Sequence, residues 1–127
     1  METLSSYALV KQANRGVSML LLDKFLQQSK LSKAELSRLL GIDPKTLDNY
    51  RQKNKTLDRL RSELLLKLLS LFELGSEVFG KTDEFRSWLH LPAGEFANAA
   101  PIDLLTTVTG AHLVERQVER IAQGYVV

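Results

Sequence analysis

The segment LDRLRSELLLKLLSLFELGSEVF, at residues 57–79, sets the architecture that we expect for the whole chain. It predicts one long helix with Thr56 as its N-cap, because a threonine hydroxyl can accept a hydrogen bond from the free N–H groups at a helix start. One apolar face repeats every seven residues, at Leu57, Leu64, Leu71 and Val78, with Leu60 and Leu74 between them. A second apolar face, around Leu65 and Leu68, means that the helix must be covered on most sides.

Two covers are available for this long helix. The C-terminal half of the same chain can pack on one face, and a second copy of the chain can pack on the other. We therefore expect a homodimer whose contact consists of Leu57, Leu60, Leu64 and Leu71. Lys67 interrupts the seam, so the pattern does not indicate a coiled coil.

The rest of the chain also predicts helices, and no segment alternates between apolar and polar residues for long enough to indicate a strand. Glycine follows the apolar stretches where a left-handed residue commonly ends a helix, at Gly16, Gly41, Gly80 and Gly124. We expect an all-α fold made of an N-terminal helix-turn-helix module, the long connecting helix and a small C-terminal helical module. The polar run Asn54-Lys55-Thr56 is the predicted joint, which divides the chain into residues 1–56 and 57–127.

Composition and charge restrict the class of protein. The 127 residues are 44% hydrophobic and 25% charged, as is usual for a globular chain. The sequence has no cysteine, no signal peptide and no apolar run near the ~20 residues that cross a bilayer, so we expect a cytoplasmic protein without membrane contact. Residues 1–60 carry 11 Lys+Arg against 6 Asp+Glu, whereas residues 61–127 carry 6 against 9. The first half is therefore the candidate for contact with phosphates.

Residues 32–51 have the layout of a helix-turn-helix. Ser32 and Glu35 form a capping box at the start of the first helix, Gly41-Ile42 is the turn, and Asp43-Pro44 starts the second helix. The positions expected to pack the two helices together are Leu36, Leu39, Ile42, Leu47 and Tyr50. Two short helices joined by a glycine turn are also compatible with an ordinary bundle whose charged residues are simply solvated.

The outer side of this motif suits a DNA groove. Asn49 can pair with adenine, and lysine and threonine can reach bases or phosphates. The predicted DNA contacts are Lys33, Lys45, Thr46, Asn49, Arg51 and Lys53. Asp43 and Asp48 oppose tight binding because carboxylates repel phosphates, although Asp48 can also accept a hydrogen bond from a cytosine amino group.

The C-terminal forty residues carry a pattern of several elements: Phe85-Arg86-Ser87-Trp88-Leu89, Pro92, Pro101-Ile102-Asp103-Leu104-Leu105, Gly110, Val114 and Arg120-Ile121-Ala122-Gln123-Gly124-Tyr125. The residues alone predict short helices packed on the long one, with the last helix beginning after Gly110 and ending at Gly124. Trp88 is expected to anchor the core.

In order and spacing this pattern resembles the toxin-binding domain of the Xre/MbcA/ParS antitoxin family. The long helix, Arg15-Gly16 and the helix-turn-helix also resemble the family's other parts, so the resemblance covers nearly the whole chain. Ala97 and Asn98 stand where the family usually has glycines, and Ala122 and Gln123 replace an acidic residue and a histidine. These departures concern the choice of partner and the shape of the loop.

The resemblance implies an antitoxin that covers the active site of a RES-type, NAD⁺-degrading toxin and represses its own operon by binding operator DNA. The predicted toxin contacts are Arg116, Arg120, Gln123, Tyr125, Val126 and Val127. The last three form an apolar tail that gains by burial in a partner, although a frayed end is an equally good interpretation of the residues alone. The alternative function is a DNA-binding repressor whose C-terminal half only oligomerises, and a third possibility is an antitoxin whose DNA-binding half has lost its operator.

No catalytic residue, metal ligand or cofactor is predicted. His90 and His112 are isolated in the sequence, and the glycines stand at helix ends instead of forming a phosphate-binding loop. We therefore expect a binding protein and not an enzyme.

Overall fold

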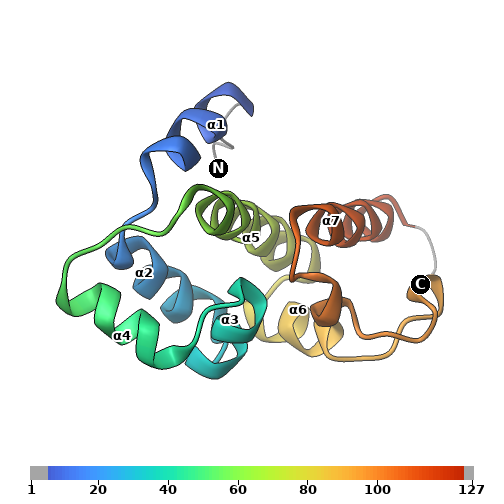
Figure 1. Ribbon diagram of the computed structural model, residues 1–127. Helices are drawn as coiled ribbons and strands as arrows, with labels where there is room; N and C mark the ends of the chain where they lie inside the picture. Colours follow the sequence, from blue (N-terminus) through green and yellow to red (C-terminus); the bar gives the residue numbers. More distant parts are fainter. Residues whose placement is uncertain (1–5, 125–127) are drawn as a thin grey trace.

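The computed structural model describes residues 6–124, which are helical over most of their length (Figure 1). The elements are α1 (Ser6–Arg15), α2 (Met19–Ser29), α3 (Lys33–Leu40), α4 (Pro44–Gln52), α5 (Arg59–Phe79), α6 (Thr82–Leu89), the 3₁₀ turns η1 (Gly94–Phe96) and η2 (Pro101–Leu104), and α7 (Val108–Ala122). The all-α prediction is confirmed. Among these residues no helix combines the length and the apolarity that crossing a bilayer requires.

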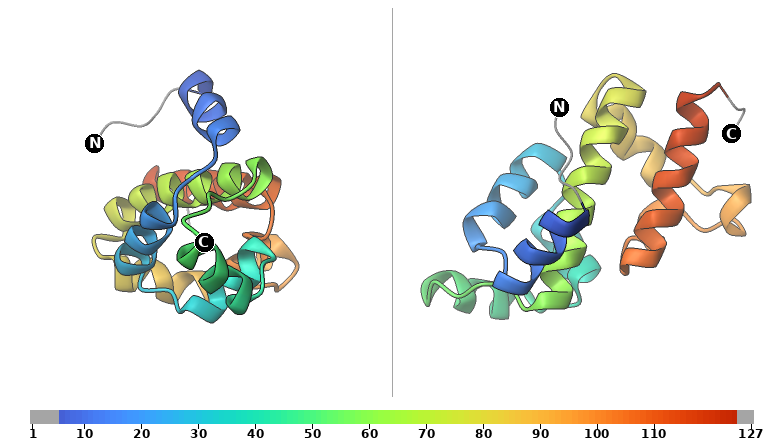
Figure 2. Two further views of the ribbon diagram at one scale, coloured as in Figure 1. Left: turned by 60° about the vertical axis from the view of Figure 1, so that its left-hand side comes forward. Right: turned by 90° about the horizontal axis from the view of Figure 1, so that it is seen from above.

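The long helix α5 is the centre of the fold. It contacts α1, α2, α3, α6 and α7. In the view of Figure 1, α1 lies above α5 and α2 to α4 lie below it, and α7 runs beside it (Figures 1 and 2). Its side chains Leu65, Leu68 and Leu71 are buried in a single core to which both halves of the chain contribute. The helix is thus covered on most sides, as its sequence requires, but the cover is this chain itself.

The predicted dimer contact is therefore corrected. Leu57, Leu64 and Leu71 are at most 5% exposed and pack inside the chain's own core, so they cannot contact a second copy in this fold. The cause is that other helices of the same chain pack around α5 and cover the face that the sequence alone left open. Leu60 is the exception, with 73% of its surface exposed.

The predicted N-cap of the long helix is also wrong. Asp58 caps α5, and its carboxylate accepts a hydrogen bond from the Arg61 N–H at 2.9 Å. Thr56 instead lies opposite Ser18 in an isolated β-bridge, which brings the start of α5 against the α1–α2 connection. A local pattern could not show this pairing, because the two residues are far apart in sequence.

The glycines predicted to end helices have positive φ angles, from +66° at Gly41 to +89° at Gly124, as left-handed termini require. Gly110 has a different role from the predicted one. It lies inside the first turn of α7, where its N–H donates to the hydroxyl of the N-cap Thr107 at 3.0 Å. A Cβ there would meet the Leu104 carbonyl oxygen at 1.7 Å, so the close approach of η2 to α7 requires glycine.

Candidate functional site

The helix-turn-helix is built as its sequence predicts. Ser32 caps α3 by accepting from the Glu35 N–H at 3.0 Å, and Asp43 caps α4 by accepting from the Lys45 N–H at 2.8 Å. The side chains between the two helices are buried or, for Tyr50, half-buried: Leu36, Leu39, Ile42, Leu47 and Tyr50. This inner packing fixes which side of α4 faces outward.

The outer side of α4 presents an exposed polar surface. Lys45, Thr46 and Asn49 are exposed there, and Lys53 is exposed just beyond the last turn. These are four of the six predicted DNA contacts, and the structure brings them together at one edge of the molecule. Their chemistry combines two cations with hydrogen-bonding groups that suit phosphates and base edges.

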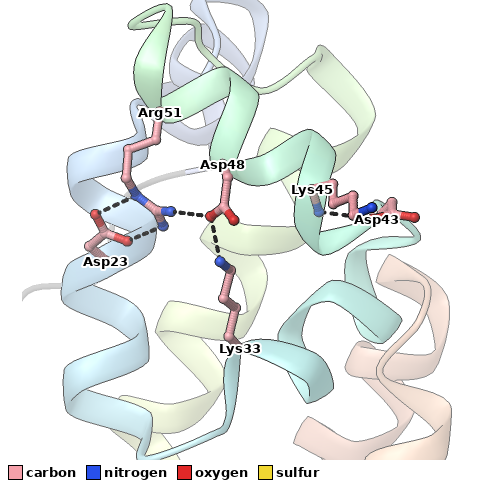
Figure 3. A network of polar contacts seen from close by, with 6 residues as sticks. All are labelled: Asp23, Lys33, Asp43, Lys45, Asp48 and Arg51. Carbon is pink, nitrogen blue, oxygen red and sulfur yellow. Dashed lines mark hydrogen bonds and ion pairs between the residues drawn. The ribbon is translucent and has the colours of Figure 1, made fainter.

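The other two predicted contacts, Lys33 and Arg51, are partly exposed but are held in ion pairs with carboxylates of the same chain (Figure 3). Lys33 pairs with Asp48, while Arg51 donates to Asp48 Oδ1 at 3.0 Å and to the two oxygens of Asp23 at 2.6 and 3.2 Å. The network ties α2, α3 and α4 together with two cations and two carboxylates. The hydrogen bond from Lys33 lowers the pKa of Asp48, and the bond to Asp23 raises the pKa of Arg51.

Asp23 was not among the residues singled out from the sequence. It lies on α2, 28 residues before Arg51, and an isolated aspartate on a helix carries no local signal of its partner. The pairing is visible only once α2 and α4 are placed side by side.

A second polar group joins α3 to the C-terminal half. Glu35 Oε2 lies 2.6 Å from His90 Nε2, and Arg38 pairs with Asp103 at 3.3 Å. The other ring nitrogen of His90, Nδ1, donates to the Arg86 carbonyl oxygen at 2.8 Å. Both imidazole nitrogens thus face acceptors, an arrangement that favours the doubly protonated ring.

The pKa values of this pair move apart. The hydrogen bond with Glu35 holds the pKa of His90 above its ordinary value. For Glu35, partial burial pushes the pKa upward, but the hydrogen bond and the charge of His90, with smaller contributions from Ser32 and Arg38, bring it below its ordinary value. The charged pair therefore links the two halves of the chain most strongly in mildly acidic solution.

The outward side of α7 is the second candidate surface. Val114 and Val118 bury the inner side of this helix, while Arg116, Arg120 and Gln123 are exposed on the outer side. Helical spacing places these three residues in one row, together with Leu113, which is 47% exposed. The predicted contacts Tyr125, Val126 and Val127 lie outside the described residues.

Each of the two histidines lies beside a carboxylate, and the two do not form a cluster that could bind a metal ion. His112 Nδ1 lies 3.6 Å from Glu115, which also binds Lys67 at 2.9 Å. Across the described residues, no three His, Cys, Asp or Glu side chains gather closely enough to hold a metal ion.

Comparison with known proteins identifies both halves. Residues 8–70 match the antitoxin Xre-like helix-turn-helix domain, and residues 74–124 match the antitoxin Xre/MbcA/ParS C-terminal toxin-binding domain. A Pseudomonas putida protein named antitoxin Xre is 24% identical over 124 residues, which cover 98% of this chain and 77% of that protein. A Sphingobium protein named Prs ADP-ribosylating antitoxin is 29% identical over 119 residues, covering 87% of this chain and 75% of that protein. The match at 74–124 contradicts the alternative in which the C-terminal half serves only for oligomerisation.

Proposed function

Because this chain belongs to the Xre/MbcA/ParS family of antitoxins, we propose that its partner is a RES-type toxin and that it inactivates the toxin by covering the NAD⁺-degrading cleft. The chain is the antitoxin of a type II toxin–antitoxin system, it is not an enzyme, and its C-terminal domain binds the cognate toxin. The proposal adds the class of toxin and the manner of inhibition.

The match of residues 74–124 to a toxin-binding domain carries this proposal. The name of the Sphingobium relative supports an NAD⁺-using partner, because the ADP-ribose of ADP-ribosylation comes from NAD⁺. Inhibition by covering a cleft needs only binding surface, which the exposed row of Arg116, Arg120 and Gln123 on α7 offers. A cation on such a surface gains most when the partner supplies a carboxylate and excludes water.

The test is co-expression of the tagged chain with the RES-type protein of the same source, with growth and co-purification as readouts. Replacing Arg116 and Arg120 together by alanine should weaken retention of the toxin and restore its toxicity. The matched control is Arg15→Ala, which removes an exposed arginine from α1, away from α7. Failure of the unaltered chain to protect cells or to retain the toxin would contradict the proposal.

We also propose that the helix-turn-helix binds operator DNA and represses the chain's own operon. Support comes from Lys45, Thr46 and Asn49, which are exposed together on the outer side of α4, and from the cationic excess of residues 1–60. Asn49→Ala should weaken binding to the DNA upstream of its gene by ~1–3 kcal/mol. An unchanged binding isotherm would contradict this assignment.

A homodimer completes the proposal, because helix-turn-helix proteins commonly read two half-sites with two copies. Only Leu60 of the four predicted contacts remains exposed. It lies in the first turn of α5, the helix on which α1 packs, and α1 itself exposes Tyr7 and Val10. These are exposed apolar side chains on two helices that pack together, and a second copy would cover them.

A further inference from the structure

We propose that Asp48 reads DNA sequence as a fixed acceptor for the exocyclic amino group of a cytosine in the major groove. The inference rests on the proposed binding of DNA by the helix-turn-helix. It assigns to Asp48 a role that its charge alone argues against, because an isolated carboxylate near phosphates is repelled.

The two oxygens of Asp48 have different surroundings. Lys33 and Arg51 both bind Oδ1, whereas Oδ2 has no hydrogen-bond partner among residues 6–124 (Figure 3). The side chain is 49% exposed. Two donors therefore hold the carboxylate in place through one oxygen and leave the other open to a ligand.

The position of Asp48 on α4 suits contact with a groove. Leu47 is buried on the inner side of the helix, while Lys45 and Asn49 are exposed on the outer side. Asp48 follows Lys45 by three residues, so the two side chains are neighbours on the helix surface. A groove that accepts Lys45 and Asn49 is therefore within reach of Asp48.

The surrounding charges offset the repulsion between Asp48 and phosphates. Lys33 and Arg51 carry two positive charges, and Asp23 and Asp48 carry two negative ones, so the network is neutral in sum. Asp23 also holds Arg51 from the side of α2 through two hydrogen bonds, at 2.6 and 3.2 Å. The cation that orients Asp48 is thus itself fixed by a second helix.

The open oxygen of Asp48 is a hydrogen-bond acceptor, and this determines which base it can bind. A carboxylate oxygen without a neighbouring donor selects an amino group, and cytosine N4 is the donor that a C·G pair presents in the major groove. Adenine also offers an amino group, but its adjacent N7 is an acceptor and would face the second oxygen unfavourably. An asparagine at position 48 would carry both an acceptor and a donor and would favour adenine.

The experiment is selection of binding sites from a randomised duplex DNA library by the full chain. We expect the unaltered protein to enrich sites with cytosine at one position. Asp48→Ala should reduce the preference at that position by roughly 5- to 150-fold while leaving the rest of the site unchanged. Asp48→Asn should move the preference toward adenine, and it keeps the size of the side chain in case the alanine variant does not fold.

Asp83→Asn is the matched control, since it removes an exposed carboxylate from α6, outside the network that holds Asp48. It should keep the selected sequence, even where overall affinity changes. If both Asp48 variants fold and select the same sequence as the unaltered chain, Asp48 is only a structural link and the inference is overturned. If the unaltered chain enriches no sequence, the proposed operator binding fails, and the inference fails with it.

Discussion

Replacing Gly110 by alanine should destabilise the junction between η2 and α7. The added Cβ would lie 1.7 Å from the carbonyl oxygen of Leu104 and 2.8 Å from its carbonyl carbon. Both are backbone atoms, so no rotation of a side chain relieves the overlap. The two elements would have to move apart in the domain that binds the toxin.

The effect of Gly110→Ala on the free energy of unfolding can be estimated from the typical effects of similar substitutions. An extra methyl group in a packed site typically costs about 1–3 kcal/mol, and contact with backbone favours the upper end of this range. The higher helix propensity of alanine returns at most ~1 kcal/mol. We therefore expect a net loss of about 2 kcal/mol in the free energy of unfolding. For a chain of this length that loss lowers the melting temperature by roughly 6–10 °C.

Urea and thermal unfolding, followed by far-UV circular dichroism, measure this change directly. Gly94→Ala is the matched control, because a Cβ at Gly94 would meet nothing within 4 Å. The control should unfold like the unaltered chain and should bind toxin normally. Equal stability of Gly110→Ala and the unaltered chain would refute the close packing of α7 on η2.

Three further predictions concern other parts of the molecule. His90→Gln should remove a pH-dependent contribution of ~0.5 kcal/mol from an ion pair that is partly exposed. Glu35 raises the pKa of His90 above its ordinary value of 6.5, and the pKa of Glu35 is lowered below its ordinary value of 4.5. The contribution of the ion pair to stability is therefore fully present between pH 4.5 and pH 6.5. It is lost as the pH rises through the folded-state pKa of His90, or falls through that of Glu35, so unfolding curves of the two proteins should converge in alkaline solution. Leu60→Glu should dissociate the proposed dimer, which light scattering measures; an unchanged mass would exclude Leu60 from the contact. Ser62→Ala should cost about 1–3 kcal/mol in urea unfolding, because the buried hydroxyl accepts from the Val17 N–H at 2.9 Å; a smaller loss would mean that the N–H finds another acceptor.

The sequence predicts the local features of this fold well, because they depend on neighbours in the chain. Ser32 and Asp43 cap the helices that they were expected to cap, and Leu36, Leu39 and Leu47 form the inner packing of the helix-turn-helix. Each of these features depends on spacings of a few residues. The exposed side of α4 could also be predicted, because it consists of the positions that the apolar spacing leaves outside the buried side.

Features that depend on contacts far apart in the sequence could not be predicted in this way. An apolar face of α5 indicates that something covers it, but not whether the cover is another copy or other helices of the same chain. The sequence therefore predicts a dimer contact for Leu64 and Leu71, whereas both are buried within the chain. Lys33 and Arg51 look like free cations in the sequence, whereas in the structure each is paired with a carboxylate.

The shared core has a consequence for how the two activities can be separated. Phe72 on α5 contacts Phe25 on α2 and Phe85 on α6, with ring centroids 5.1 Å apart in both pairs and edge-to-face geometry. Such pairs stabilise beyond the area they bury, and here they join a helix of the helix-turn-helix half to a helix of the toxin-binding half. A fragment cut at residue 57 would expose the N-terminal side of this aromatic row and of α5 to water. Loss of toxin binding by such a fragment would then report unfolding as much as a missing contact. Substitution of the exposed residues Asn49 and Arg120 tests the proposed DNA contact and the proposed toxin contact more cleanly, because both lie outside the common core.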